Sequence, residues 1–160
     1  CSSDLDILMR NNKKYLHLGL LVLRIGLGIM FILHGYPKIT GGLDKWASLG
    51  ELGMSKMGIS FGWVYWGFLA AASEFFGGLF LVIGLAVRLS GFFLFFTMLI
   101  AAAFHLLSGD GIMGASHAIE SGTIFLFLIF SGGGHYALDQ IIYNRISHPI
   151  LKNIFSSAIN

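Results

Sequence analysis

The sequence predicts an all-α membrane protein, a four-transmembrane-helix bundle with an amphipathic outer loop between the first two helices. Of the 160 residues, 56% are apolar, and the 22 glycines bring the apolar-plus-glycine share to about 70%, against about 45–50% in soluble domains. Charged residues make up 11%. The apolar stretches approach the roughly 20 residues that cross a bilayer as a helix, and they lack the polar alternation of an outer-membrane barrel.

Four apolar stretches are predicted to span the membrane, at about residues 15–36, 64–87, 89–107 and 115–134. The first is expected to end at Pro37, because proline lacks an N–H and its ring disrupts a helix. Between the second and third stretches the single charged residue is Arg88, which predicts a tight helix hairpin. Consecutive glycines from Gly132 are expected to stop the fourth helix.

The transmembrane domain, residues 15–143, is expected to lie between a cytoplasmic N-terminal segment, 1–14, and an interfacial cytoplasmic tail, 144–160. The loop 37–63 is too polar to span and mixes tryptophan and methionine with charges, so it predicts an amphipathic lid at the outer interface. The helix flanks on the side of the membrane that carries the N-terminus contain more lysines and arginines than the flanks on the other side. The positive-inside rule therefore places both termini in the cytoplasm.

Charge and cysteine content exclude several functions. The formal net charge is +2 and the ten Lys and Arg residues are scattered, so no basic stripe is available to bind nucleic acid. Cys1 is the single cysteine, which excludes an internal disulfide, a Cys-x-x-Cys redox pair and a thiolate metal cage within the chain. Redox chemistry would need a cofactor or a partner.

Two charged residues lie deep within the predicted helices. Arg24 is about 13 Å and Glu74 about 20 Å from the predicted inner ends of their helices. A charge in hydrocarbon costs at least about 2.5–3.5 kcal/mol and therefore needs a partner. We expect an Arg24–Glu74 ion pair, which would either lock the bundle or face a ligand.

Further polar side chains gather toward the outer third of the predicted bundle, above Glu74. They are His34, Lys38, His105, His117 and Glu120. Because the helices alternate in direction, we expect these groups to converge on one pocket that hydrogen-bonds the polar head of a ligand. The three-residue spacing of His117 and Glu120 also suits metal ligands, but a zinc site needs three or four converging ligands, which spacing alone does not supply. No metal is predicted.

Three sequence motifs in order resemble those of the DoxX family of small four-helix membrane proteins. They are LRIGLGIMFILHGYPKITGG (23–42), SEFFGGLFLVIGLAVRLSG (73–91) and SGGGHYALD (131–139). The resemblance implies a bacterial inner-membrane protein connected with sulfur and redox metabolism. Relatives include the membrane subunit of a thiosulfate:quinone oxidoreductase.

Two main functions are therefore expected. The first is a quinone-interacting subunit of a membrane oxidoreductase complex, in which His34 or His105 hydrogen-bonds a quinone carbonyl and Glu74 or Glu120 exchanges protons. The second is a non-enzymatic assembly or scaffold protein, in which the polar cluster only stabilises the bundle. A small-solute or proton pathway is a third alternative and would need association of several copies, because four short helices enclose little space.

Overall fold

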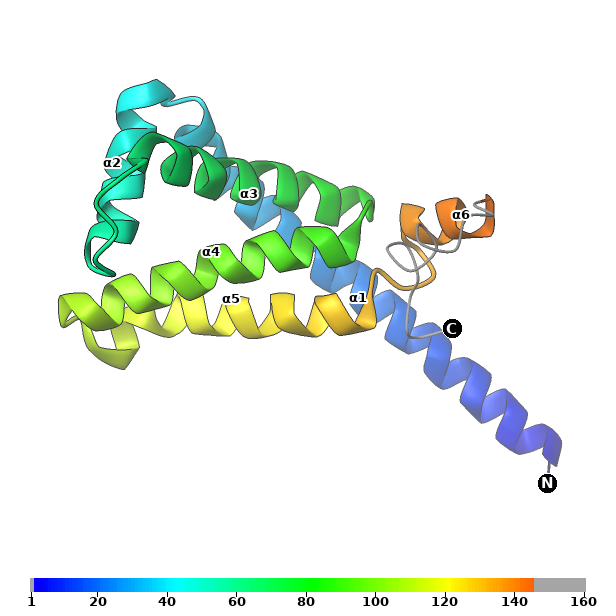
Figure 1. Ribbon diagram of the computed structural model, residues 1–160. Coiled ribbons are helices and arrows are strands. Elements are labelled where there is room, and N and C mark those ends of the chain that lie inside the picture. Colours follow the sequence, from blue (N-terminus) through cyan, green and yellow to red (C-terminus); the bar gives the residue numbers. More distant parts are fainter. Residues whose placement is uncertain (1, 146–160) are drawn as a thin grey trace.

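The computed structural model describes the backbone of residues 2–145 and the side chains from Asn12 onward. Every regular element in this range is a helix (Figure 1). The helices are α1 (Ser2–Ile39), α2 (Gly42–Ser55), α3 (Trp63–Ile83), α4 (Val87–Ser108), α5 (Gly111–Ser131) and α6 (Leu138–Arg145). Nearly all of the predicted tail, 144–160, lies outside the described residues.

The predicted fold class is confirmed. Four helices are long and apolar enough to cross a membrane, at Asn12–Ile39, Trp63–Ile83, Val87–Ser108 and Gly111–Ser131. The helix pairs α1–α3 and α4–α5 pack along their lengths, and α4 also packs against α3. The short helix α2 lies across α3 at one end of the bundle and α6 lies at the other (Figure 1). We call these the α2 end and the α6 end.

The helix boundaries differ from the predicted ones where local backbone conformation decides them. The first helix continues past Pro37 to Ile39, because a proline in the last turn removes a single intrahelical bond. The second helix ends at Ile83 rather than residue 87. Gly84 and Ala86 both adopt left-handed conformations, with φ of 74° and 47°, and turn the chain between α3 and α4.

The predicted outer loop contains the 14-residue helix α2. Two glycines allow α2 and α3 to cross with their backbones in contact. A Cβ atom on Gly50 would overlap the carbonyl of Trp63, and one on Gly67 would overlap the carbonyl of Trp46. The Trp46 indole N–H also donates to the Lys38 carbonyl oxygen at 3.0 Å. The helix α2 is therefore fixed to both α1 and α3.

Glycine contacts also set the register of α1 against α3. A Cβ atom on Gly28 would lie 2.7 Å from the carbonyl oxygen of Gly78, and one on Gly78 would lie 2.8 Å from that of Gly28. Further toward the α2 end, a Cβ on Gly35 would lie 2.5 Å from the backbone nitrogen of Phe75. Such close backbone approach is characteristic of small residues in membrane helices. It places Glu74 level with Gly35.

Candidate ligand pocket

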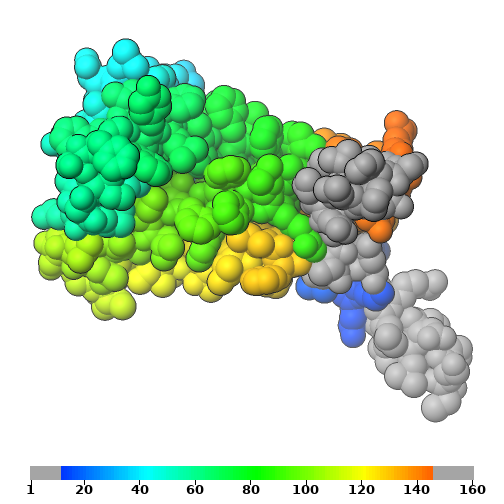
Figure 2. Space-filling view, viewed as in Figure 1, coloured from blue at the N-terminus to red at the C-terminus, as the bar shows by residue number. Residues whose placement is uncertain are grey.

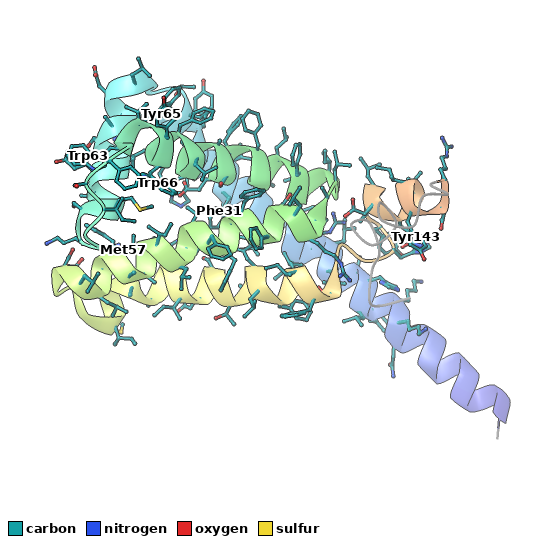
Figure 3. All side chains as sticks on the ribbon, viewed as in Figure 1. Phe31, Met57, Trp63, Tyr65, Trp66 and Tyr143 are labelled. Carbon is teal, nitrogen blue, oxygen red and sulfur yellow. The ribbon has the colours of Figure 1, made fainter. Side chains whose placement is uncertain are left out.

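A pocket of about 560 Å³ lies at the α2 end, between α2, α3 and α4. This volume is within the range of small-molecule sites. Trp66 from α3 lines it, and Figure 3 shows this residue at the α2 end. The apolar and aromatic part of the wall includes Leu49, Met54, Trp66, Leu69, Phe92, Phe93, Phe96, Ile100 and Phe104. Lys38, Ser73, Glu74, Thr97 and His105 supply polar groups.

The strongest polar feature of the pocket is an ion pair between α1 and α3. The Lys38 ammonium donates to both carboxylate oxygens of Glu74, at 2.7 and 2.5 Å. Glu74 is 4% exposed, whereas the Lys38 side chain is 29% exposed. The carboxylate is therefore neutralised inside the bundle by a cation that reaches it from the last turn of α1.

The predicted Arg24–Glu74 ion pair is wrong. The depth of Arg24 was counted from Tyr15, but Arg24 lies level with the end of α3, and the preceding part of α1 extends past it. Glu74 instead lies level with Gly35, about three helical turns away along α1. The predicted register is wrong because the two helices do not begin at the same depth.

Arg24 is fully buried at the α6 end. Its guanidinium donates to the carbonyl oxygens of Leu81, at 3.1 Å, and Tyr136, at 3.2 Å. It thereby joins α1, the end of α3 and the segment that follows α5. Gly84 is required beside it, because a Cβ there would overlap the guanidinium.

Asp139 completes this junction, and its role was not predicted from the sequence. Its carboxylate accepts hydrogen bonds from the backbone N–H groups of Ala86 and Val87, at 2.6 and 2.8 Å, at the start of α4. Burial raises the pKa of Asp139, while these two hydrogen bonds and the nearby Arg24 act in the opposite direction. The signal in the sequence was an acidic residue five positions after the last glycine of a helix stop, Gly134, which suits a cap for a neighbouring helix.

Arg88 lies in the first turn of α4 rather than in the hairpin turn itself. Its guanidinium donates to the Phe130 carbonyl oxygen at 3.1 Å, near the end of α5. Arg88 therefore links α4 to α5 at the α6 end, on the opposite side of the bundle from the pocket. Together, Arg88, Arg24 and Asp139 therefore connect the helices at the α6 end by hydrogen bonds.

His105 lies in the pocket wall near the end of α4. Its Nδ1 is 2.7 Å from the Asp110 carboxylate, and both side chains are partly exposed. When Nδ1 donates to Asp110, Nε2 remains as the acceptor in the neutral ring. Asp110 was not among the predicted residues, and the signal for it was its position just past the α4 terminus at Gly109.

His34, His117 and Glu120 do not line the pocket, so the predicted single cluster is wrong. The rings of His34 and His117 are 6.0 Å apart on the α1–α5 side of the bundle, and Glu120 is exposed on the outer face of α5. The helix face on which a residue lies is set by packing, which residue spacing along the sequence does not give. Among the side chains of residues 12–145, no three His, Cys, Asp or Glu groups converge as a metal site requires.

Comparison with known proteins supports the resemblance seen in the motifs. The DoxX family model matches residues 19–106, which include Arg24, Lys38, Glu74 and His105. The inner membrane protein YqjF of Escherichia coli (strain K12) is 34% identical over 142 residues, covering 83% of this chain and 98% of that protein. An uncharacterized Haemophilus influenzae protein is 30% identical over 144 residues, covering 86% of this chain and all of that protein. No solved structure matches. This four-span membrane protein, with its Lys38–Glu74 pocket and its Arg24 junction, belongs to the DoxX family.

Proposed function

We propose that this DoxX-family protein binds a quinone in the pocket between α2, α3 and α4, as the quinone-interacting subunit of an oxidoreductase complex in a bacterial inner membrane. In this proposal both termini are cytoplasmic. The supporting observation is the bidentate Lys38–Glu74 ion pair in a wall that is mostly aromatic and apolar. Such a site suits a ligand that is apolar over most of its surface and carries a few hydrogen-bond acceptors.

The polar groups of the pocket match the two carbonyl oxygens of a quinone. An ammonium group has three donors, and two of those on Lys38 are used by Glu74. The third is available to one carbonyl oxygen. His105 is the candidate partner of the second carbonyl oxygen when its free ring nitrogen carries a proton, with Asp110 balancing the charge. The expected role of Lys38 and His105 in ligand binding is retained, while His34 and His117 take no part.

Reduction of a quinone to a hydroquinone takes up two electrons and two protons. In this proposal the electrons come from a redox group of a partner subunit, because the chain has neither a Cys-x-x-Cys pair nor a thiolate cage. The His105–Asp110 pair supplies protons from the water side, since both side chains are partly exposed. The candidate proton group on the other side of the ring is the Lys38–Glu74 pair, in which the ammonium gives up the proton and is reprotonated from water, since the Lys38 side chain is 29% exposed. Glu120 is not a candidate, because it lies outside the pocket.

The aromatic side of the pocket offers a route from the lipid. Phe92, Phe93 and Phe96 line the pocket and are 39–45% exposed on α4. A second, shallower pocket of about 220 Å³ shares Leu69, Ser73 and Phe93 with the first and continues between α3 and α4 toward the α6 end. The surface of α3 and α4 is visible in Figure 2. This groove suits the tail of a membrane quinone whose head lies beside Lys38.

Quinone binding can be measured by tryptophan fluorescence, because Trp66 lines the pocket and Trp46 in α2 and Trp63 at the start of α3 lie at the same end. Purified protein in lipid nanodiscs is titrated with a short-tailed ubiquinone or menaquinone analogue. We expect saturable quenching in the wild type. His105→Ala should weaken binding about 5- to 30-fold, the value of one hydrogen bond, and Ala101→Trp should abolish it by filling the pocket.

His117→Ala is the matched control, because it removes the same side chain at a position outside the pocket. Its quinone affinity should equal that of the wild type. Absence of saturable quenching in the wild type, or equal losses in His105→Ala and His117→Ala, would remove the pocket as a quinone site. In that case the scaffold function would be favoured, since it requires no small ligand at Lys38.

A further inference from the structure

Glu120 is an acidic residue exposed on the outside of a membrane-spanning helix. It is the tenth of the 21 residues of α5, about 14 Å from Gly111 and about 16 Å from Ser131 by the helical rise. Glu120 is exposed, whereas Ser121 and Phe125 of the same helix are buried in the core. A carboxylate at this depth in lipid is costly unless a donor covers it.

The described part of the chain provides no cation within ion-pair distance of Glu120. The two basic residues of α1 within the bundle are committed elsewhere. Arg24 bonds to carbonyl groups at the α6 end, and Lys38 bonds to Glu74 in the pocket. Among the described residues no lysine or arginine pairs with Glu120, so its carboxylate is open to a donor from a second protomer.

The same face carries donors that fit a carboxylate. His117 precedes Glu120 by one helical turn, and the His34 ring lies 6.0 Å from that of His117. Both imidazoles are exposed. The depth difference between His117 and Glu120 is about 4.5 Å, which side chains of this length can bridge. This face therefore carries both the donor and the acceptor of a hydrogen bond that a second copy of itself would complete.

The adjoining flank of α1 permits close approach of another helix. Gly19 and Gly26 are seven residues apart and share a helix face, and a Cβ atom on either would meet nothing within 4 Å. At Gly28 and Gly35, in contrast, the space that a Cβ atom would take is occupied by α3. The exposed glycines share their face with Met30, which is also exposed. Small exposed residues of this kind allow backbone contact between membrane helices.

We propose that this protein forms a twofold dimer through the α1–α5 face, defined by Gly26 and His34 of α1 and His117 and Glu120 of α5. Glu120 of each protomer accepts a hydrogen bond from the partner subunit's His117, with the partner subunit's His34 beside that imidazole. Copies inserted in the same direction are related by an axis along the membrane normal, so only residues at similar depth can meet. The acid and the imidazoles fulfil this condition, and each contact occurs twice. The inference does not depend on the proposed quinone site.

The test measures association of the full chain in liposomes. Protein labelled at Cys1, the single cysteine, is reconstituted over a range of protein-to-lipid ratios, and the dimer fraction is counted by single-molecule photobleaching. We expect a wild-type dimer. Glu120→Leu and His117→Leu should each raise the dissociation constant at least tenfold, because each removes two symmetric contacts. Gly26→Leu should do so by keeping the helices apart.

Tyr65→Leu is the control, because it removes an exposed polar side chain from α3, away from the α1–α5 face. It should leave the dissociation constant unchanged. Circular dichroism of each variant checks that its helix content is that of the wild type, as expected for exposed positions. A wild-type monomer at every density would overturn the proposal. So would an oligomer that Glu120→Leu and His117→Leu leave intact, or that Tyr65→Leu weakens equally.

Discussion

Replacing Lys38 with methionine would leave the Glu74 carboxylate buried without its cation. Protonating a carboxylate of ordinary acidity at pH 7 costs about 3.7 kcal/mol. This value limits the penalty, because the group can take up a proton instead of remaining charged. Breaking a buried ion pair at one partner typically costs about 3–5 kcal/mol. We therefore expect Lys38→Met to lower the free energy of unfolding by about 3–4 kcal/mol at pH 7.

Removing the other member of the ion pair should lower the free energy of unfolding by less. In Glu74→Gln the Lys38 ammonium loses its partner, but this side chain is 29% exposed, and its long stem can carry the charge toward water. The expected loss is about 1–2 kcal/mol. In the double variant no charge remains, so it should be more stable than Lys38→Met alone. A two-way mutant cycle isolates this coupling.

Unfolding by sodium dodecyl sulfate in mixed micelles, followed by tryptophan fluorescence, measures these differences. Lys45→Met is the matched control, because it removes an exposed lysine of α2 and should change the free energy of unfolding by less than about 0.5 kcal/mol. Equal losses in Lys38→Met and Glu74→Gln would refute the argument from burial. A double variant no more stable than Lys38→Met would refute the ion pair as the cause.

Three further predictions concern packing and pH. Gly50→Val should detach α2 from α3 and abolish quinone binding. Gly53→Ala should retain quinone binding, because its methyl group would meet one side-chain atom at 3.5 Å. The nanodisc titration measures quinone binding by both variants. Gly28→Leu should destabilise the fold by at least about 3 kcal/mol through overpacking, whereas Gly26→Leu should leave the unfolding midpoint in detergent unchanged. Equal unfolding midpoints for the two variants would contradict the contact between Gly28 and α3. Burial raises the pKa of Asp139 above 3.8, so the folded state holds this proton to higher pH than the unfolded chain. Stability from this group should fall as pH rises from about 3.8 to the raised value and stay level above it, a slope that Asp139→Asn should remove in unfolding curves recorded from pH 4 to 7.

The sequence predicted what depends on composition and helix periodicity. Four spans of sufficient length could be identified because about 20 apolar residues in succession have few alternatives to crossing a bilayer. Their ends could not be located closely, because they depend on backbone conformations such as the left-handed Ala86. The helix within the loop 37–63 was anticipated as an amphipathic segment but not as a fixed part of the bundle, since its position is set by two glycines in contact with distant carbonyl groups.

The positions of the polar residues were also predicted only in part. Lys38, Glu74 and His105 were predicted to lie near a ligand, and all three line the pocket. The partner of Glu74 was misassigned because the register between α1 and α3 depends on where Gly28 meets Gly78. Glu120 was predicted in the outer third of the bundle and in the pocket, whereas it lies near the middle of α5 and is exposed. Residue spacing gives depth along each helix, whereas the rotation of a helix in the bundle is decided by all of its contacts together.

The junction at the α6 end also constrains the order of assembly during synthesis. Arg24 enters the membrane early, but one of the carbonyl groups that it binds belongs to Tyr136, which is translated after all four spans. The carboxylate that accepts hydrogen bonds from the first residues of α4 is made later still, at Asp139. The helices can therefore be inserted one after another, but the α3–α4 hairpin acquires its final hydrogen bonds only when the chain after α5 folds back. A ribosome-bound chain that ends before residue 136 holds Arg24 with one of its two acceptors still missing.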